Sequence, residues 1–328
     1  MIMTFDYKDI NLIPKMCIVD SRSECDTSII LGKYKFNLPV IPANMESVIN
    51  EELAIKLAQN NFFYIMHRFH INIIDFIKRM KELNLYTSIS IGVNQESYIL
   101  IDKLVELNLI PEFITIDIAH GHSIKMKNIL TYIRTKQEYK DTLIIAGNIS
   151  TREAICDFYN WGADIIKVGI GPGSACTTYP NTGFGSRDIQ AYCVKECYEE
   201  AKKYNIPIIA DGGISNVCDI AKSLVMGAKL VMIGGMLSGF EESPGKIITG
   251  QDGKLYQEFY GSASEYSKTH TGDKKIKNIE GTIKLVLYKN KSIFRFFEEL
   301  KEALQSSISY GGGKDLSCFE TVSFIIKK

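Results

Sequence analysis

Short apolar runs rich in β-branched residues alternate along this chain with longer segments whose apolar residues recur at helical spacing. Each short run is typical of a buried strand, and each longer segment is typical of an amphipathic helix. The expected strands are Leu38–Ala43, Phe62–Met66, Thr87–Val93, Phe113–Asp117, Leu143–Gly147, Asp164–Val168, Ile206–Ala210 and Leu230–Gly234. The expected helices are Glu51–Gln59, Ile74–Leu83, Ser97–Leu107, Ser123–Lys136, Arg152–Trp161, Ile189–Lys203 and Asn216–Met226.

Strands that alternate with helices in this way predict parallel pairing through crossover helices. Eight predicted strands favour an α/β fold of the (β/α)8 TIM barrel type over an open doubly wound sheet. No linker, low-complexity tract or repeat interrupts the alternation. We therefore expect residues 1–328 to form a single barrel domain without an inserted regulatory domain.

Functional residues of such barrels gather at the C-terminal ends of the strands. Polar residues and glycines follow several predicted strands here, namely Asn44-Met45, His67-Arg68, Asp117, Asn148, Asp211-Gly212-Gly213 and Gly234-Gly235. Polar residues are ordinary at strand ends, but two Gly-Gly pairs after consecutive strands match the phosphate site common in these barrels. The pattern predicts a phosphorylated ligand.

The most distinctive loop is Val168–Gly185, with the sequence VGIGPGSACTTYPNTGFG. Its first glycines allow backbone angles that other residues avoid, so the chain can approach a ligand closely. Backbone amides in such a loop can hold a phosphate or an ion. Cys176 follows them, where a thiol can be presented to a substrate. Taken alone, the run also fits a Gly-rich turn that holds a small buried cysteine.

Composition narrows the possible partners. The 328 residues include 38 basic and 38 acidic side chains, which argues against broad nucleic-acid or membrane binding. The chain shows no signal-peptide pattern and no apolar run near the roughly 18 residues that span a bilayer, so we expect a cytoplasmic protein. Its eight cysteines contain no C-x-x-C pair and are expected to be reduced. Cys193 and Cys197 share one face of a predicted helix and are expected to be packing residues.

Several motifs in order resemble those of the IMP dehydrogenase/GMP reductase family. They are FDYKDINLIP, SRSECDT, PVIPANM, DIAHGHS, AGN, GIGPGSACTT, IADGGI, MIGG, EESPG, FYGSAS and SSISYGGG. The resemblance runs essentially from end to end. Met66 leads straight to Thr87 without room for a regulatory domain, and no Arg-Tyr pair lies between Tyr260 and Glu280. Both features favour the short bacterial GMP reductase branch over the dehydrogenase branch.

The resemblance implies an oxidoreductase that uses NADPH to convert GMP to IMP and ammonia in purine salvage. It implies that Cys176 attacks purine C2 and forms a covalent thioimidate. It also implies that Thr178 and Glu280 act as a pair that relays protons to the departing ammonia.

The same resemblance assigns binding roles, residue by residue. The implied nucleotide-binding residues are Met45, Ser174, Asp211, Gly212, Gly213, Gly234, Gly235, Tyr260, Gly261, Ser262, Lys277 and Gly281, with Asp211 at the ribose and the glycine amides at the 5′-phosphate. The implied cofactor-binding residues are Arg68, Asp117, Ala119, Thr178 and Glu280. Carbonyl groups of Gly171 and Gly173 are candidate ligands of a potassium ion. A homotetramer is also implied.

Some residues depart from the family pattern. Arg68 stands where some reductases carry a lysine and cannot readily lose a proton. Lys277 replaces an arginine, Ser262 replaces a methionine, and Arg187-Asp188 replaces the usual Pro-Gln. Asp117 fits a helix N-cap as well as a cofactor contact.

Two other functions stay open. One is an NAD-dependent IMP dehydrogenase. The other is a non-catalytic purine-nucleotide sensor on the same barrel, against which the combination of Cys176, Thr178 and Glu280 argues, because binding alone needs none of them.

Overall fold

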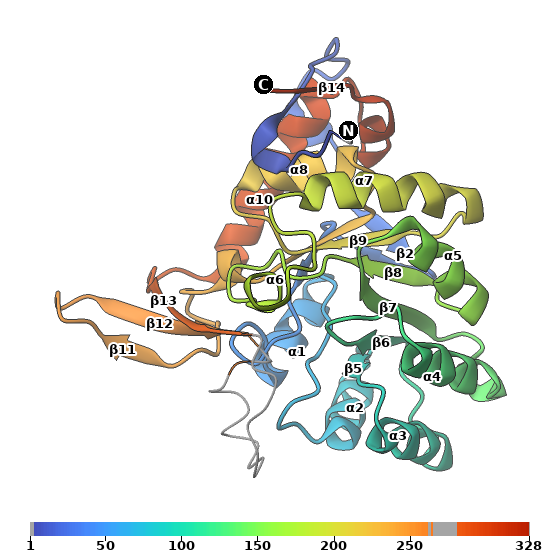
Figure 1. Ribbon diagram of the computed structural model, residues 1–328. Coiled ribbons are helices and arrows are strands. Elements are labelled where there is room, and N and C mark those ends of the chain that lie inside the picture. The colour runs from blue at the N-terminus through green and yellow to red at the C-terminus, as the bar shows by residue number, and fades with distance from the viewer. Residues whose placement is uncertain (1–2, 262–263, 265–280, 328) are drawn as a thin grey trace.

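The computed structural model describes residues 3–261, 264 and 281–327 (Figure 1). Its centre is a seven-stranded parallel sheet in the order β4-β10-β9-β8-β7-β6-β5. The strands are β4 (Val40–Pro42), β5 (Ser88–Ile91), β6 (Phe113–Asp117), β7 (Leu143–Ile149), β8 (Ile165–Val168), β9 (Ile208–Asp211) and β10 (Leu230–Ile233). The sheet curls and places β4 beside β10, which confirms the predicted fold class.

The predicted strand Phe62–Met66 is wrong in its extent. Only Met66 pairs with β5, through one parallel bridge to Ile89. Side-chain hydroxyls replace the missing ladder: Tyr86 donates to the carbonyl of Phe62 at 2.6 Å, and Tyr64 donates to the carbonyl of Tyr86 at 3.1 Å. The segment therefore lies along the edge of β5 without forming a regular strand.

Helices cover the outside of the sheet at nearly the predicted positions. They are α1 (Glu51–Gln59), α2 (Ile73–Glu82), α3 (Gln95–Glu106), α4 (Ile124–Arg134), α5 (Arg152–Trp161), α7 (Gln190–Ala201) and α8 (Val217–Val225). Side chains of Asn50, Asn72, Asn94 and Ser123 accept hydrogen bonds from backbone amides in the first turns of α1 to α4. Such caps explain why helix starts were readable from the sequence.

The remaining elements lie around this barrel. β1 (Ile10–Leu12) pairs antiparallel with β14 (Phe324–Ile326), so the two ends of the chain meet (Figure 1). β2 (Ile29–Leu31) and β3 (Tyr34–Phe36) form a hairpin, and α10 (Ile293–Tyr310) packs on α8. β11 (Ile247–Thr249), β12 (Leu255–Tyr260) and β13 (Ile283–Leu287) form an antiparallel sheet that projects from one side. Neither the short helix α6 (Thr178–Thr182) nor the long helix α10 was predicted. Short 3₁₀ turns occur at Tyr7–Asp9, Arg22–Glu24, Gln137–Tyr139, Lys202–Tyr204, Gly235–Leu237 and Leu316–Thr321.

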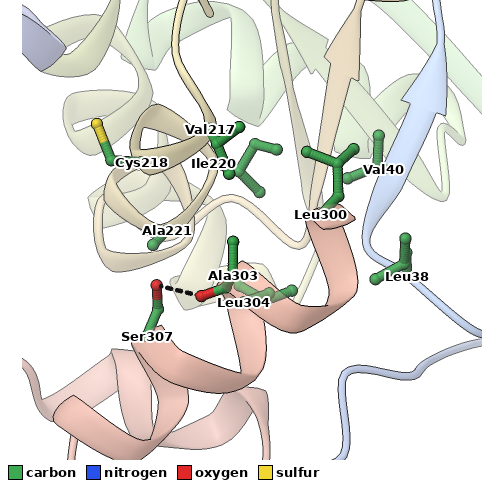
Figure 2. Close-up of a pocket in the computed structure, with 10 residues that line it drawn as sticks. All are labelled: Leu38, Val40, Val217, Cys218, Ile220, Ala221, Leu300, Ala303, Leu304 and Ser307. Atoms are coloured by element: carbon green, nitrogen blue, oxygen red, sulfur yellow. Dashed lines mark hydrogen bonds between the residues drawn. The ribbon is translucent and has the colours of Figure 1, made fainter. Parts of the chain in front are cut away.

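An apolar cavity of about 130 Å³ lies between α8 and α10, beside the start of β4 (Figure 2). Its one hydroxyl, on Ser307, donates to the carbonyl of Ala303 at 3.0 Å within α10. The lining lacks the converging polar groups of a nucleotide site. We interpret it as a gap in the packing.

All eight cysteines are unpaired. Cys193 and Cys197 are buried on α7, as expected for packing residues. Within the described part of the chain, no helix combines the length and apolar character needed to cross a membrane.

Candidate functional site

The loop that carries Cys176 leaves β8 through Gly169. This glycine has φ +146°, and a side chain there would place its Cβ 2.0 Å from the carbonyl oxygen of Asp211. The buried amide of Gln190 fixes the same crossing, since Nε2 donates to the carbonyls of Val168 at 2.8 Å and Asp211 at 3.3 Å. The loop therefore packs tightly against the end of β9, and only glycine fits at its start.

Cys176 lies beside the hydroxyl of Thr178. The Sγ atom is 3.2 Å from Thr178 Oγ1, and Thr178 is the first residue of α6. The Cys176 amide donates to the carbonyl of Gly173 at 3.0 Å, and Arg187 Nη2 donates to the carbonyl of Cys176 at 2.8 Å. Two of the predicted catalytic residues are thus in contact. Arg187, which was not predicted to take part in binding or catalysis, holds the loop Val168–Gly185, which we call the reactive loop.

The projecting sheet brings its base to the reactive loop. The amide of Thr282 donates to the carbonyl of Ala175 at 2.9 Å, and Cys176 forms an isolated bridge with Gly281. The amide of Gly261 approaches the carbonyl of Thr282 at 3.4 Å. Gly281 therefore lies next to Cys176, and Gly261 lies beside Ala175 and Gly281. The predicted residues Ser262, Lys277 and Glu280 lie outside the described residues.

The two Gly-Gly pairs lie around Ser174. A Cβ on Gly212 would come within 3.2 Å of the Gly173 amide nitrogen, and a Cβ on Gly235 would lie 3.6 Å from Ser174 Oγ. The atom nearest to this added Cβ would be a ring carbon of Phe259 at 3.5 Å, which is ordinary van der Waals contact, so a methyl group fits there without a clash. The glycines thus form a cradle that a methyl group would partly fill, which suits the approach of a phosphate to backbone amides.

A cavity of about 570 Å³ opens at this end of the site. Ser174, Gly213, Arg187 and Lys284 are among its lining residues. Tyr260 is fixed nearby on the main chain, since its amide donates to Ser47 Oγ at 3.2 Å and its carbonyl accepts from that hydroxyl at 2.8 Å. Hydroxyl, amide and cationic groups therefore face a space large enough for a ligand, together with the carboxylates of Asp6, Asp188 and Asp219.

A buried ammonium group joins two of the predicted ligand-binding carboxylates. Lys167 lies in β8 with 2% of its side chain exposed, and its Nζ is 2.9 Å from Asp117 Oδ1 and 2.7 Å from Asp211 Oδ2. Burial alone would lower the pKa of Lys167, but the two carboxylates raise it above its usual value. Burial opposes ionisation of Asp117 too, yet the Lys167 charge and the Asn44 hydrogen bond hold its pKa below the usual value.

The sequence patterns did not single out Lys167 as a site residue. The available signal was its place as a lone basic residue in the apolar run ADIIKVG, since lysine is almost never fully buried without a charged partner.

Asparagine side chains complete the network. Asn44 Nδ2 donates to Asp117 Oδ2 at 2.8 Å, and Asn148 Nδ2 donates to Asp211 Oδ2 at 2.8 Å. Asn148 Oδ1 is buried and has no hydrogen-bond partner among the described residues. An unpaired buried acceptor beside two carboxylates suits a ligand that brings hydroxyl or carboxamide donors, as a ribose or a nicotinamide does.

The other predicted cofactor residues gather more loosely. The charge of Arg68 contributes to lowering the pKa of Asp117, so the two lie on the same side of the site, and the guanidinium is 4.6 Å from the centre of the Phe69 ring. Asp117 is not a helix cap, because Ser123 caps α4. Ala119 is exposed in the loop after β6, and Met45 is partly buried after β4.

The predicted potassium ligands remain a prediction. A Cβ added to Gly171 would lie 3.4 Å from the amide nitrogen of Tyr179. The carbonyl of Gly173 already accepts a hydrogen bond from the amide of Cys176. In the described ranges, no group of three or more His, Cys, Asp or Glu side chains is arranged to hold a metal ion.

Comparison with known proteins decides the family. The family model for the IMP dehydrogenase / GMP reductase domain matches residues 3–327. The chain belongs to this family. It is 51% identical over 324 residues to the GMP reductase of Mesoplasma florum, and this match covers 99% of the present chain and 98% of the relative. It is also 50% identical over 325 residues to the GMP reductase of Bacillus subtilis, and this match covers 99% of the present chain and 96% of the relative.

Proposed function

We propose that this chain is an NADPH-dependent GMP reductase that converts GMP to IMP and ammonia. The observation that carries the proposal is the contact of 3.2 Å between Cys176 Sγ and Thr178 Oγ1, on a loop held beside the glycine cradle. Relatives about 50% identical over nearly their whole length carry the name GMP reductase, which supports the same activity here.

In the proposed reaction, the Cys176 thiolate forms a bond to purine C2. The bond between C2 and the exocyclic nitrogen breaks, and the nitrogen leaves as ammonia after it gains protons. Thr178, at hydrogen-bond distance from Cys176 Sγ, is placed to pass a proton at this position, and Glu280 is its proposed partner. The covalent product is a thioimidate, and the thiolate is released when C2 is reduced.

Residues at the strand ends bind the nucleotide in this proposal. Ser174 and the amides of Gly213, Gly234 and Gly235 hold the 5′-phosphate, together with Tyr260. Asp211 accepts hydrogen bonds from the ribose hydroxyls. The cradle around Gly235 and the cavity beside Ser174 support this orientation, with the base directed toward Cys176.

The cofactor side is formed by Arg68, Asp117, Ala119 and the unpaired acceptor of Asn148. Bound NADPH supplies the hydride that reduces C2. The positive charge of Arg68 suits a phosphate of the dinucleotide, and its permanent charge fits binding better than proton transfer. We also propose a potassium ion at the Gly171 and Gly173 carbonyls, a homotetramer and a cytoplasmic location.

Purified protein tests the direction of the reaction. We expect NADPH absorbance to fall on addition of GMP, with IMP and ammonia formed in equal amounts. Reduction of NAD⁺ with IMP, and no reaction with GMP, would instead identify a dehydrogenase. Binding of GMP without turnover in either direction would identify a sensor. Omission of potassium from the same assay tests the cation.

A further inference from the structure

Lys167 lies in one row of the sheet with Gly147 and Asp117. Gly147 is the register partner of Asp117 across β6 and β7, and of Lys167 across β7 and β8. A Cβ on Gly147 would come within 2.5 Å of Lys167 Cβ. The missing side chain on β7 therefore leaves the space through which the lysine reaches a carboxylate two strands away.

The same ammonium reaches Asp211 on the other side. Asp211 ends β9, which pairs directly with β8, and its Oδ2 lies 2.7 Å from Lys167 Nζ. Because a buried charge without a partner is very unfavourable, the two carboxylates supply the partners that the buried Lys167 ammonium requires. The positive charge of Arg68 also helps to lower the pKa of Asp117.

The two carboxylates are engaged differently. Asp117 uses Oδ1 for Lys167 and Oδ2 for Asn44. Asp211 receives both Lys167 and Asn148 on the same atom, Oδ2. The network thus fixes the plane of the Asp211 carboxylate and directs its internal bonds to one oxygen, so that Oδ1 is the atom presented to a ligand.

We propose that Lys167 is a positioning residue that orients Asp211 toward the ribose hydroxyls of the nucleotide and ties this carboxylate to Asp117. The inference rests on the proposed nucleotide-binding function. If this role is right, Lys167 affects recognition of the ribose hydroxyls and does not affect recognition of the base or the phosphate.

Binding of GMP and of its 2′,3′-dideoxy analogue tests this role without any turnover. Hydrogen bonds to a charged group are among the stronger ones, so we expect the wild-type protein to prefer GMP by roughly tenfold or more. In Lys167→Met the affinity for GMP should fall to that for the analogue, while the affinity for the analogue stays unchanged. Lys167→Arg, which keeps the charge, should recover part of the preference.

Other outcomes overturn the inference in different ways. A preference retained in Lys167→Met would contradict it, and an equal loss of affinity for both ligands would assign Lys167 to the fold alone. If Lys167→Met does not fold, the double variant Lys167→Met/Asp117→Asn removes one unpaired buried charge, and the same ratio decides. Failure of the wild-type protein to bind either nucleotide would count against the proposed function itself.

Discussion

Arg187 is hydrogen-bonded to the backbone carbonyl of Cys176, with 2.8 Å between Nη2 and the oxygen. The arginine lies on a turn that is itself fixed, because the amide of Ser186 donates to the carbonyl of Ile170 at 2.7 Å. Two parts of the loop, before and after the cysteine, are therefore held by one turn.

Loss of the Arg187 side chain should slow the reaction more than it weakens binding. A charge-assisted hydrogen bond contributes about 1.5–3 kcal/mol, so we expect Arg187→Met to lower kcat by roughly tenfold with a small change in KM for GMP. Steady-state kinetics measure both. Lys8→Met is the matched control, because Lys8 lines the same cavity but pairs weakly with Asp188 at 3.9 Å. An unchanged kcat in Arg187→Met would contradict the role.

A methyl group on Gly235 should separate phosphate recognition from folding. The backbone there needs no left-handed conformation, and the added Cβ meets nothing closer than 3.5 Å, so the fold should tolerate Gly235→Ala. The methyl would occupy space beside Ser174 Oγ, where we place the phosphate. We expect the affinity for GMP to fall roughly tenfold and that for guanosine to stay the same, as measured by calorimetry. Equal affinity of both proteins for GMP would move the phosphate elsewhere.

His67 should make stability depend on pH. His67 is 7% exposed, and burial lowers its pKa to about 4 from the usual 6.5. The charge of Glu46 raises this pKa and the charge of His70 lowers it, but both effects are smaller than that of burial. Because the unfolded state binds more protons between these values, the stabilisation is complete above pH 6.5 and is lost as the pH falls toward 4. From pH 7 to 4.5 the free energy of unfolding should fall by about 2–3 kcal/mol on this account.

The variant His67→Asn isolates this effect. An asparagine oxygen can replace Nδ1 as the acceptor of the Phe69 amide, which lies 3.2 Å from that atom, but it does not titrate. Urea unfolding at the two pH values should show a smaller loss for the variant than for the wild-type protein. Equal losses would mean that His67 is protonated without penalty in the folded state.

The apolar cavity between α8 and α10 offers a test of packing. Ala303→Leu places a good helix former with more apolar volume against it, and we expect the free energy of unfolding to rise by about 1 kcal/mol with unchanged activity. Glu302→Leu adds the same side chain at an exposed position of α10 and should give no such gain. A lower stability for Ala303→Leu would show that the cavity cannot accept the larger side chain.

Local patterns predicted the helices between the barrel strands well, but they missed the 18-residue helix α10 and predicted the long-range contacts poorly. α1 and α5 begin and end where their amphipathic patterns do, because caps and periodicity act within a few residues. Phe62–Met66 has the composition of a strand, but its pairing depends on hydroxyl groups of Tyr64 and Tyr86 that only the assembled barrel brings into place. A propensity for extended structure does not contain this information.

The candidate site shows the same division. Cys176, Thr178, Asp211 and the Gly-Gly pairs were predicted from the distinctive motifs that contain them, and their roles stay predictions. The Lys167 network was not, because it depends on the register that sets Gly147 between Lys167 and Asp117. Arg187 was noticed only as a departure, since nothing local shows that its side chain turns back to the reactive loop.

The most direct measurement is turnover and GMP binding of Cys176→Ala, compared with Cys197→Ala, which removes a buried packing thiol on α7. We expect Cys176→Ala to bind GMP and to show no GMP-dependent oxidation of NADPH, while Cys197→Ala keeps its activity. Turnover that persists without the Cys176 thiol would contradict the proposed covalent reaction.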